Sequence, residues 1–342
     1  MTYGRALNRL LVNMSKQLGT SFAWGYPSAL MIEPTNTCNL ACVLCPTGAG
    51  WLKHPQGRMD IAAFRRLIDE AGPYLDRVAF WNWGEPFLHP AVVDMVRYVR
   101  QWPVWVQICT NGHFFSDHAI AVEVVESGLD QVIISMDGAT TKSIQQYRGP
   151  RASMDKILEG IHNLASARKA IGKTSPWIEV QFLVMRHNQD EIEMTRAMAT
   201  DAGADRFYCK TINLRPEDLE SFGSLLPDAP EFSRFDVNSD GRWSIRGMPA
   251  GICPYVYNTA VVIWDGSLLP CCFDAEEAIL LGNAFKDGLW RAWNSDFFRS
   301  FRYRVRHHRA SIPMCAWCPE ERCENHARLG RFWTDLDSNA SL

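Results

Sequence analysis

Short apolar runs alternate with longer amphipathic stretches over most of the chain. Runs rich in branched and aromatic residues predict six strands, at Ala29 to Glu33, Val78 to Trp83, Trp105 to Thr110, Gln131 to Met136, Trp177 to Met185 and Arg206 to Ile212. Apolar residues at helical spacing predict helices between them, at Ile61 to Ala71, Ala91 to Arg100, His118 to Ser127, Met154 to Ile171 and Glu191 to Ala202. Such alternation is typical of a parallel sheet with crossover helices. We therefore expect an α/β fold in which residues 29–214 form a partial (β/α)6 TIM-type barrel.

The pattern changes on both sides of this region. Residues 1–28 carry leucines and a methionine at helical spacing, which predicts a helical segment that packs on the barrel. Residues 215–250 are rich in Pro, Asp and Ser without clear periodicity, which indicates a linker or bridging region. In residues 251–326, Asp265-Gly266 favours a tight turn between two short strands, and aromatic residues from Trp290 to Phe301 mark a helix. We expect a small cysteine-rich unit of β-hairpin and helix there, followed by a tail at 327–342.

The composition limits the classes of function. The 342 residues, 47% of them hydrophobic, suffice for one barrel and a smaller unit. No apolar run is long enough to cross a membrane, and the first segment lacks a signal-peptide core. Eleven cysteines therefore indicate the reducing cytoplasm, where thiols bind metals. The net charge of −3 argues against general nucleic-acid binding, and the basic run from Arg299 to Arg309 is expected to be a solvated face, with phosphate capture as the alternative.

Three closely spaced cysteines are the most informative residues of the chain. Cys38, Cys42 and Cys45 follow the first predicted strand. Iron–sulfur clusters normally have four cysteine ligands, so three cysteines without a fourth nearby leave one iron open to an exogenous ligand. The alternatives are a zinc site or buried structural thiols. Zinc requires a fourth nitrogen or sulfur ligand close by, and the nearest histidine, His54, lies in a Pro/Gly-rich stretch. The spacing therefore favours a reactive cluster.

Other polar residues follow the predicted strands in the same way. Glu85 lies in Trp83-Gly84-Glu85-Pro86 after the second strand, the third strand ends in Thr110-Asn111-Gly112, and the fourth ends in Ser135-Met136-Asp137-Gly138. The carboxyl ends of parallel barrel strands meet at one mouth, so we expect these residues to lie near the cysteines. Short polar residues before glycine also form ordinary turns, so that alternative stays open.

The cysteine run and the segments after the strands resemble the radical S-adenosylmethionine (SAM) superfamily. The resemblance implies one [4Fe-4S] cluster on Cys38, Cys42 and Cys45, with SAM as the fourth ligand and as the source of a 5'-deoxyadenosyl radical that takes hydrogen from the substrate. It also implies that Gly84 and Glu85 contact the amino group of SAM, although Trp83 departs from the family's Gly-Gly-Glu segment. Further residues that resemble positions contacting SAM or substrate are Thr110, Asn111, Ser135, Asp137, Gln181, Arg186 and Asn188, with Arg148 as a rival carboxylate clamp.

The C-terminal part resembles the SPASM/Twitch family of auxiliary-cluster domains. The resemblance rests on Asp265-Gly266, on the segment Pro270 to Asp274 and on Gly282. The shorter Twitch pattern implies one auxiliary [4Fe-4S] cluster with four cysteine ligands. Those ligands are Cys253, Cys271, Cys315 and Cys318, with Cys272 as an alternate and Cys323 unexplained. A zinc site on four cysteines is the alternative, because paired Cys-x-x-Cys elements suit zinc equally well.

Together the resemblances imply a radical SAM enzyme with a small-molecule substrate and an electron donor such as flavodoxin or ferredoxin. We favour oxidation of a small hydroxylated metabolite, such as an amino sugar or cyclitol. The alternatives are an epimerase in which Cys209 donates hydrogen, a maturase of a ribosomally made peptide, and a non-catalytic metal scaffold. Cys209 would face the cavity in the epimerase, although a free cysteine is more often a small buried hydrophobe. Cys109 is expected in the core of the third strand, and Trp81 and Trp83 are candidates for the wall of a pocket.

Overall fold

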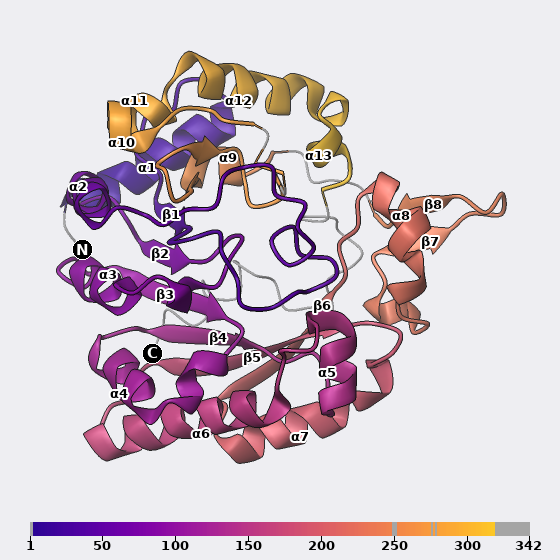
Figure 1. Ribbon diagram of the computed structural model, residues 1–342. Helices are drawn as coiled ribbons and strands as arrows, with labels where there is room; N and C mark the ends of the chain where they lie inside the picture. The colour runs from indigo at the N-terminus through magenta and orange to yellow at the C-terminus, as the bar shows by residue number, and fades with distance from the viewer. Residues whose placement is uncertain (1–2, 248–251, 275, 278, 319–342) are drawn as a thin grey trace.

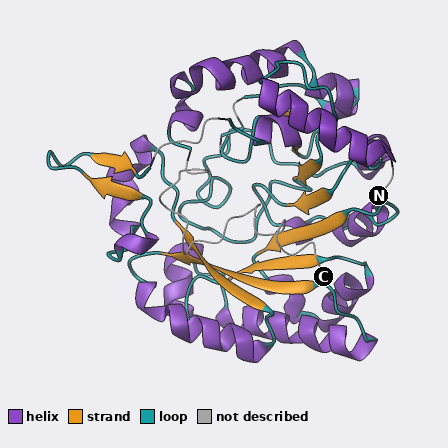
Figure 2. Ribbon diagram, turned by 180° about the vertical axis from the view of Figure 1, so that it is seen from behind, coloured by secondary structure: helices purple, strands orange, loops and turns teal. Residues whose placement is uncertain are grey.

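A curved parallel sheet with helices on its outer side forms the body of the molecule (Figure 1, Figure 2). The computed structural model describes residues 3–247, 252–274, 276–277 and 279–318. The six barrel strands, in the order in which they pair, are β1 (Ala29–Ile32), β2 (Arg77–Phe80), β3 (Trp105–Thr110), β4 (Gln131–Ser135), β5 (Trp177–Val184) and β6 (Arg206–Thr211). The helices that follow them are α2 (Ile61–Ala71), α3 (Val92–Val99), α4 (His118–Glu126), α5 (Thr141–Arg148), α6 (Met154–Ile171) and α7 (Ile192–Ala202). The predicted α/β partial barrel is confirmed.

The helices begin and end at residues that complete their backbone hydrogen bonds. Asp60 caps α2 by accepting from the backbone N–H of Ala63, and Ser153 caps α6 in the same way. Such a cap stabilises a helix by about 1 kcal/mol. Gly172 ends α6 with φ +74°, a left-handed conformation that favours glycine. The residues at the ends of α2 and α6 therefore favour helices with the same limits as those in the tertiary structure.

The C-terminal hairpin extends the barrel sheet. Strands β9 (Thr259–Val262) and β10 (Leu268–Leu269) form the expected antiparallel pair, but β9 also pairs in parallel with β1 along its whole length. The sheet thus has eight strands in the order β10-β9-β1-β2-β3-β4-β5-β6. Ala260, Val261 and Val262 are fully buried because barrel packing covers both faces of β9. The proposed domain boundaries stay a prediction. This sheet nevertheless joins strands of the predicted barrel (29–214) to strands of the predicted auxiliary unit (251–326).

The segment expected to be a linker contains regular structure. It forms α8 (Pro216–Phe222) and a hairpin of β7 (Phe235–Val237) and β8 (Trp243–Ile245), which projects from the barrel in Figure 1. Leu219, Leu226 and Phe235 are buried in a cluster of their own with Tyr147 and Met185. The sequence did not predict these elements because they are too short to show periodicity, and the interpretation as a linker or bridging region stays a prediction.

Helix α1 (Tyr3–Leu18) packs on the barrel as expected, but through its polar side. Arg5 donates to the carbonyl of Pro103 at 2.7 Å, and Asn8 donates to the carbonyl of Tyr26 at 3.1 Å. Both side chains are buried. The leucines that were expected to face the barrel, Leu7, Leu10 and Leu18, are 57%, 55% and 64% exposed. The apolar stripe of α1 therefore faces outward.

Short helices complete the C-terminal part: α9 (Tyr255–Asn258), α10 (Ala284–Asp287), α11 (Leu289–Trp293), α12 (Asp296–His308) and α13 (Pro313–Ala316). The basic run on α12 is only partly a solvated face. Arg302 is fully buried, donates Nε to the carbonyl of Val256 at 2.7 Å, and lies over the rings of Trp293 and Phe298. Burial lowers its pKa to about 9. Arg302 is thus a packing residue and is not available to a phosphate. Within the described part of the chain, we find no helix with the length and apolarity needed to span a bilayer.

Candidate active site at the barrel mouth

The loop that carries the first three cysteines is held by main-chain hydrogen bonds. Ala41 donates to the carbonyl of Arg148 at 3.1 Å, and Val43 donates to the carbonyl of Tyr147 at 3.0 Å. Both acceptors belong to the last turn of α5, so the loop lies along the end of that helix. This anchoring keeps the cysteine loop at the carboxyl end of the sheet.

The three thiols of the loop are suited to act together as ligands of one iron–sulfur cluster. Burial is the main cause that raises the pKa of Cys38 and of Cys42 to about 11. Burial also raises the pKa of Cys45, and Arg148 acts in the opposite direction at all three thiols. The thiols also raise one another's pKa, so they lie within electrostatic reach of one another. Metal ligands must be deprotonated, so iron binding would replace these protons. Among the described residues, no three His, Cys, Asp or Glu side chains lie close enough together to bind a single metal ion. An iron–sulfur cluster does not need that arrangement, because each cysteine binds a different iron. This donor set fits a [4Fe-4S] cluster.

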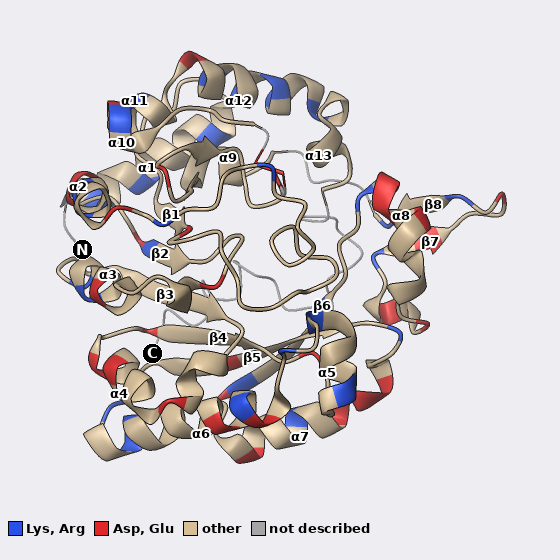
Figure 3. Ribbon diagram, viewed as in Figure 1, with Lys and Arg blue, Asp and Glu red and all other residues tan. Residues whose placement is uncertain are grey.

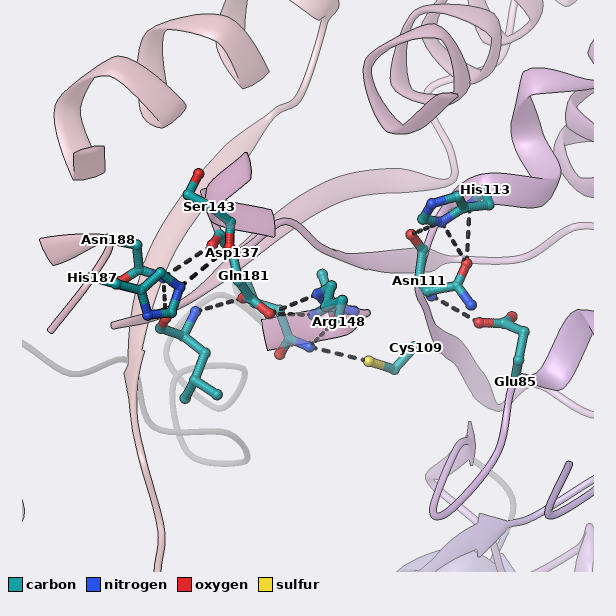
Figure 4. A network of polar contacts seen from close by, with 12 residues as sticks. Glu85, Cys109, Asn111, His113, Asp137, Ser143, Arg148, Gln181, His187 and Asn188 are labelled. Carbon is teal, nitrogen blue, oxygen red and sulfur yellow. Dashed lines mark hydrogen bonds and ion pairs between the residues drawn. The ribbon is translucent and has the colours of Figure 1, made fainter. Parts of the chain in front are cut away.

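Glu85 belongs to a buried hydrogen-bond network and is joined in Figure 4 to Asn111. Thr110 Oγ1 donates to its Oε1 at 2.7 Å, the backbone N–H of Asn111 donates to its Oε2 at 2.8 Å, and the N–H of Phe87 donates to Oε1 at 3.2 Å. Burial raises the pKa of Glu85 to about 6, against the lowering effect of these donors. The structure therefore brings Glu85, Thr110 and Asn111 together, as expected.

The turn before Glu85 requires glycine at position 84, but not at position 83, where this chain has Trp83. Gly84 has φ +133°, and a Cβ there would lie 2.1 Å from the carbonyl oxygen of Thr35. No other residue fits that position. The N–H of Trp83 donates to Glu33 Oε2 at 3.1 Å, and Asn82 donates to the same oxygen at 2.9 Å. The backbone of Trp83 is thus engaged by this buried carboxyl.

Two residues that the sequence did not single out join the network. Asn39, inside the cysteine run, accepts from Asn111 Nδ2 at 2.8 Å. His113 Nδ1 lies 2.9 Å from Asn111 Oδ1, and His113 Nε2 accepts from the N–H of Ser153 at 2.9 Å. These contacts fix the amide of Asn111 between the cysteine loop and the start of α6. A lone histidine after a glycine turn gives no sequence signal for this role.

A second row of polar side chains crosses strands β3 to β6. Gln181 Nε2 donates to Ser135 Oγ and lies 3.4 Å from Cys109 Sγ, and Tyr208 OH donates to Gln181 Oε1 at 3.1 Å. Cys109 also lines the mouth cavity, so its assignment to the core was wrong: the side chain points to the barrel axis. The expected residues Ser135 and Gln181 therefore lie together inside the barrel.

Asp137 and Arg148 form a buried ion pair with an Nε–Oδ2 distance of 2.7 Å. Burial alone would lower the pKa of Arg148, but the carboxylate of Asp137 raises it. Asn188 is fully buried and donates to the carbonyl of Asp137 at 3.0 Å. Arg186 is not brought to the site: its side chain is 53% exposed and pairs with Asp228 at 3.2 Å.

A cavity of about 410 Å³ opens beside this network. The side chains that line it include Leu44 and Pro46 of the cysteine loop, the indoles Trp51, Trp81 and Trp83, and Cys109, Tyr147, Gln181, Lys210, Tyr255, Cys272 and Phe273. Cys209 is not among them. It is buried with Phe182, Val184 and Ile192 on the side of β6 that faces α7, as expected for a small buried hydrophobe. The alternative, in which Cys209 faces the cavity as a hydrogen donor, was wrong.

A smaller cavity of about 30 Å³ is lined by Cys253, Cys271, Cys315 and Cys318. Burial and neighbouring thiols raise the pKa of Cys253 to about 11 and that of Cys315 to about 12. Arg309 lines the same cavity. Burial would lower its pKa, but Cys253 and Cys318 raise it. This set of four thiols beside a cation fits an anionic iron–sulfur cluster.

Cys271 and its neighbour Cys272 face different cavities. Cys271 lines the small cavity with the other three thiols, whereas Cys272 lines the mouth cavity. Tyr255 and Phe273 line both cavities and so lie between them. The structure thus separates Cys272 from the expected ligand set. Cys323 lies outside the described residues.

Both parts of the chain match known protein families. Residues 32–199 match the model of the radical SAM superfamily, and residues 253–319 match that of the SPASM iron–sulfur cluster-binding domain. The chain belongs to the radical SAM superfamily. As a radical SAM protein it uses a [4Fe-4S] cluster and SAM, and its SPASM domain carries auxiliary iron–sulfur chemistry.

Relatives cover both parts of this radical SAM protein. The tungsten-containing aldehyde ferredoxin oxidoreductase cofactor-modifying protein of Pyrococcus furiosus is 27% identical over 315 residues, which is 84% of this chain and 86% of that protein. Mycofactocin maturase MftC of Mycobacterium tuberculosis (strain H37Rv) is 25% identical over 338 residues, 91% of this chain and 80% of that protein.

Solved structures share the fold. SuiB of Streptococcus suis bound to S-adenosylmethionine has a TM-score of 0.60 at 17% identity, covering 91% of this chain and 76% of SuiB. BtrN in complex with AdoMet and 2-DOIA has a TM-score of 0.51 at 21% identity, covering 84% of this chain and 91% of BtrN. These similarities show that barrel and auxiliary region follow the fold of known radical SAM proteins.

Proposed function

We propose that this radical SAM protein is a maturase that modifies a short ribosomally made peptide. The observation that carries the proposal is the similarity to mycofactocin maturase over 91% of the chain, which includes the barrel and the auxiliary region. The PqqA peptide cyclase of Ruegeria pomeroyi adds support, with 25% identity over 203 residues, 59% of this chain and 51% of that protein. Peptide maturation thus moves from an alternative to the first candidate.

Oxidation of a small hydroxylated metabolite is the second candidate. The mouth cavity of about 410 Å³ favours it, because that volume suits one small molecule or one or two side chains of a peptide. An epimerase that uses Cys209 has no geometric support, since that thiol faces α7.

We assign the same cofactor sites in both cases. Cys38, Cys42 and Cys45 would hold the first cluster, and the network of Glu85, Thr110, Asn111, Ser135 and Gln181 would hold SAM. When bound, this pair supplies the radical that abstracts hydrogen. Buried Glu85 would pair with the ammonium of SAM, because a charge-assisted hydrogen bond in a dry site is strong. Asp137 and Arg148 would position the cysteine loop through the end of α5.

The auxiliary region would take up the second electron of an oxidation. Cys253, Cys271, Cys315 and Cys318 would hold one auxiliary [4Fe-4S] cluster, and Tyr255 and Phe273 separate it from the substrate cavity. We expect a flavodoxin or ferredoxin as electron donor, and the cytoplasm as the location, because thiols stay reduced there.

The test is turnover by anaerobically reconstituted protein with SAM, reductant and a synthetic peptide, encoded by any short reading frame beside the gene. We expect the peptide to stimulate 5'-deoxyadenosine formation and to lose hydrogen, as seen by mass spectrometry. A variant with Cys38, Cys42 and Cys45 changed to alanine is the control and should do neither. Stimulation by a cyclitol or amino sugar but not by peptide would support the second candidate instead. Retained deuterium from heavy water would contradict oxidation and indicate epimerisation.

A further inference from the structure

A buried carboxyl lies at the start of the loop that crosses the mouth. This loop, from β1 to α2, is mostly uncharged (Figure 3). Glu33 follows β1 directly, is fully buried, and donates its backbone N–H to the carbonyl of Val262 in β9 at 3.0 Å. Its carboxyl oxygen Oε2 accepts from Asn82 and from the N–H of Trp83. Glu33 therefore connects the junction of barrel and auxiliary region with the turn that leads to Glu85.

Glu277 comes from the auxiliary region and lies next to Glu33. Its side chain is fully buried and within hydrogen-bond reach of the Glu33 carboxyl. Its backbone has φ +52°, a left-handed conformation that residues other than glycine rarely adopt. Such a conformation persists where the surroundings hold the residue in place, and it is common at functional sites. The position of Glu277 is therefore set by the structure around it.

The loop that carries Glu277 begins at a predicted ligand of the auxiliary cluster. The N–H of Asp274 donates to the carbonyl of Cys271 at 3.2 Å, and the N–H of Glu277 donates to the carbonyl of Asp274 at 3.1 Å. Two successive turns thus connect Cys271 with Glu277. A path of direct contacts therefore runs from the auxiliary region through Glu277 and Glu33 to the turn before Glu85.

The two carboxyls need a proton between them. Among the described residues, no donor group bonds to Glu33 Oε1 or to either carboxyl oxygen of Glu277. A carboxylate only accepts hydrogen bonds, whereas a protonated carboxyl can donate one. Two buried carboxylates this close also repel each other, so one of them is expected to keep its proton. In agreement with this, burial and then the charge of Glu277 raise the pKa of Glu33.

His54 and two further acids surround Glu277. His54 Nδ1 lies 3.9 Å from Glu277 Oε2, which is too far for a hydrogen bond, and His54 Nε2 lies 3.3 Å from Asp265 Oδ2. Burial raises the pKa of Glu277, the charge of His54 lowers it, and the charges of Asp274 and Asp265 raise it. His54 therefore does not replace the bond between the two carboxyls.

We propose that Glu33 and Glu277 share one proton and that this bond holds the turn of Asn82 and Trp83 in place for SAM. Glu277 is then a positioning residue that the auxiliary region contributes to the SAM site. Without the bond, the carboxyl of Glu33 would turn away from the N–H of Trp83, and Glu85 would lose its fixed orientation. The inference rests on the assignment of SAM to the Glu85 network, and it holds for either candidate substrate.

SAM affinity tests the positioning role. Reconstituted protein is titrated anaerobically with SAM, without substrate or reductant. Glu277→Gln can still donate a hydrogen bond to Glu33, so it should bind SAM within about twofold of wild type. Glu277→Leu has a similar size but no donor, so it should bind SAM about tenfold more weakly. Asp296→Leu on α12 is the matched control and should bind SAM as wild type does, because the carboxylate of Asp296 is 98% exposed.

The infrared spectrum of the apo-protein tests the proton itself. At neutral pH, the difference between wild type and Glu277→Gln should contain the C=O band of one protonated carboxyl, because the amide leaves Glu33 as a carboxylate. Glu277→Gln keeps the size of the side chain and a hydrogen-bond donor, so it is expected to fold. This measurement therefore decides the matter even if Glu277→Leu does not fold.

The outcomes separate this inference from the proposed function. Wild-type SAM affinity in Glu277→Leu, at normal iron content, would overturn the inference. An equal loss of affinity in Glu277→Gln, or the absence of the protonated-carboxyl band, would overturn it as well. If the variants behave as expected but no peptide is modified in the turnover experiment, the proposed function alone fails.

Discussion

Arg148 donates to Asp137 with two guanidinium nitrogens, at 2.7 and 2.5 Å, and both side chains are buried. The other carboxylate oxygen of Asp137 accepts from the backbone N–H of Leu183 at 2.8 Å. The pair therefore ties the end of α5, and with it the cysteine loop, to strand β5. An arginine that seemed suited to clamp a ligand is occupied by the protein itself.

Loss of the carboxylate charge should destabilise the barrel strongly. Asp137→Asn leaves a buried guanidinium without its counter-charge, so we expect the free energy of unfolding to fall by about 3 to 5 kcal/mol. Urea unfolding of the apo-protein measures this. Asp240→Asn is the control, because its partner Arg242 is exposed and such pairs contribute about 0 to 1 kcal/mol. Equal losses in both variants would contradict a structural role for the buried pair.

SAM binding should depend on the protonation of Glu85. Its pKa is raised to about 6, mainly by burial. Below that pH the carboxyl gains a proton and loses the charge that would hold an ammonium. We expect SAM affinity to be constant above about pH 7 and to fall roughly tenfold per unit below about pH 6. Titration of reconstituted protein measures it. Glu85→Gln should bind weakly without this pH dependence, and a variant that keeps the wild-type profile would show that another group titrates.

The carboxyls of Glu33 and Glu277 lie close together beneath the mouth, and burial raises the pKa of both. A carboxyl whose pKa is raised by folding stabilises the folded state below its unfolded pKa, and that stability is lost as the pH rises through the folded pKa. Glu277→Gln should therefore raise the melting temperature relative to wild type by an amount that grows as the pH rises above about 4.3, the ordinary pKa of a glutamate. Thermal unfolding of the apo-protein measures the difference. A difference independent of pH would mean that the pair does not titrate in this range.

The neighbours Cys271 and Cys272 should differ in their effect on iron content. Cys271 lines the small thiol cavity and Cys272 lines the mouth cavity. Cys271→Ala should therefore lose the iron of the auxiliary cluster, whereas Cys272→Ala should retain it. Iron and sulfide per chain after anaerobic reconstitution, together with the low-temperature spectrum of the reduced cluster, measure this. The reverse result would place Cys272 in the ligand set.

The sequence predicts the barrel strands well because branched and aromatic residues recur in short, largely buried runs, as in β4, where every residue is buried. It does not predict α5, whose residues are mostly polar and which begins at the capping box of Thr140 and Ser143. It also predicts that Cys209 and Lys210 face opposite sides of β6, but it cannot say which side is the interior. Helix α7 settles that by covering Cys209.

Some residues of the candidate site could likewise be predicted from the sequence, and others could not. Motifs point to Cys38 and Glu85, because their roles follow from local spacing. Asn39 and His113 depend on contacts between segments 72 and 40 residues apart, which no local pattern records. The facing directions of Cys271 and Cys272 likewise follow from three-dimensional packing alone.

The parallel pairing of β1 with β9 has a consequence for synthesis on the ribosome. β1 begins at Ala29, but its partner begins only at Thr259. At a rate of about 5 to 20 residues per second, β1 waits on the order of 10 to 50 s with one edge unpaired. An apolar strand edge invites pairing with other chains. The nascent protein is thus prone to aggregation until β9 has been made and has paired with β1. Slow translation or a shortage of chaperones should therefore reduce its yield before any iron is inserted.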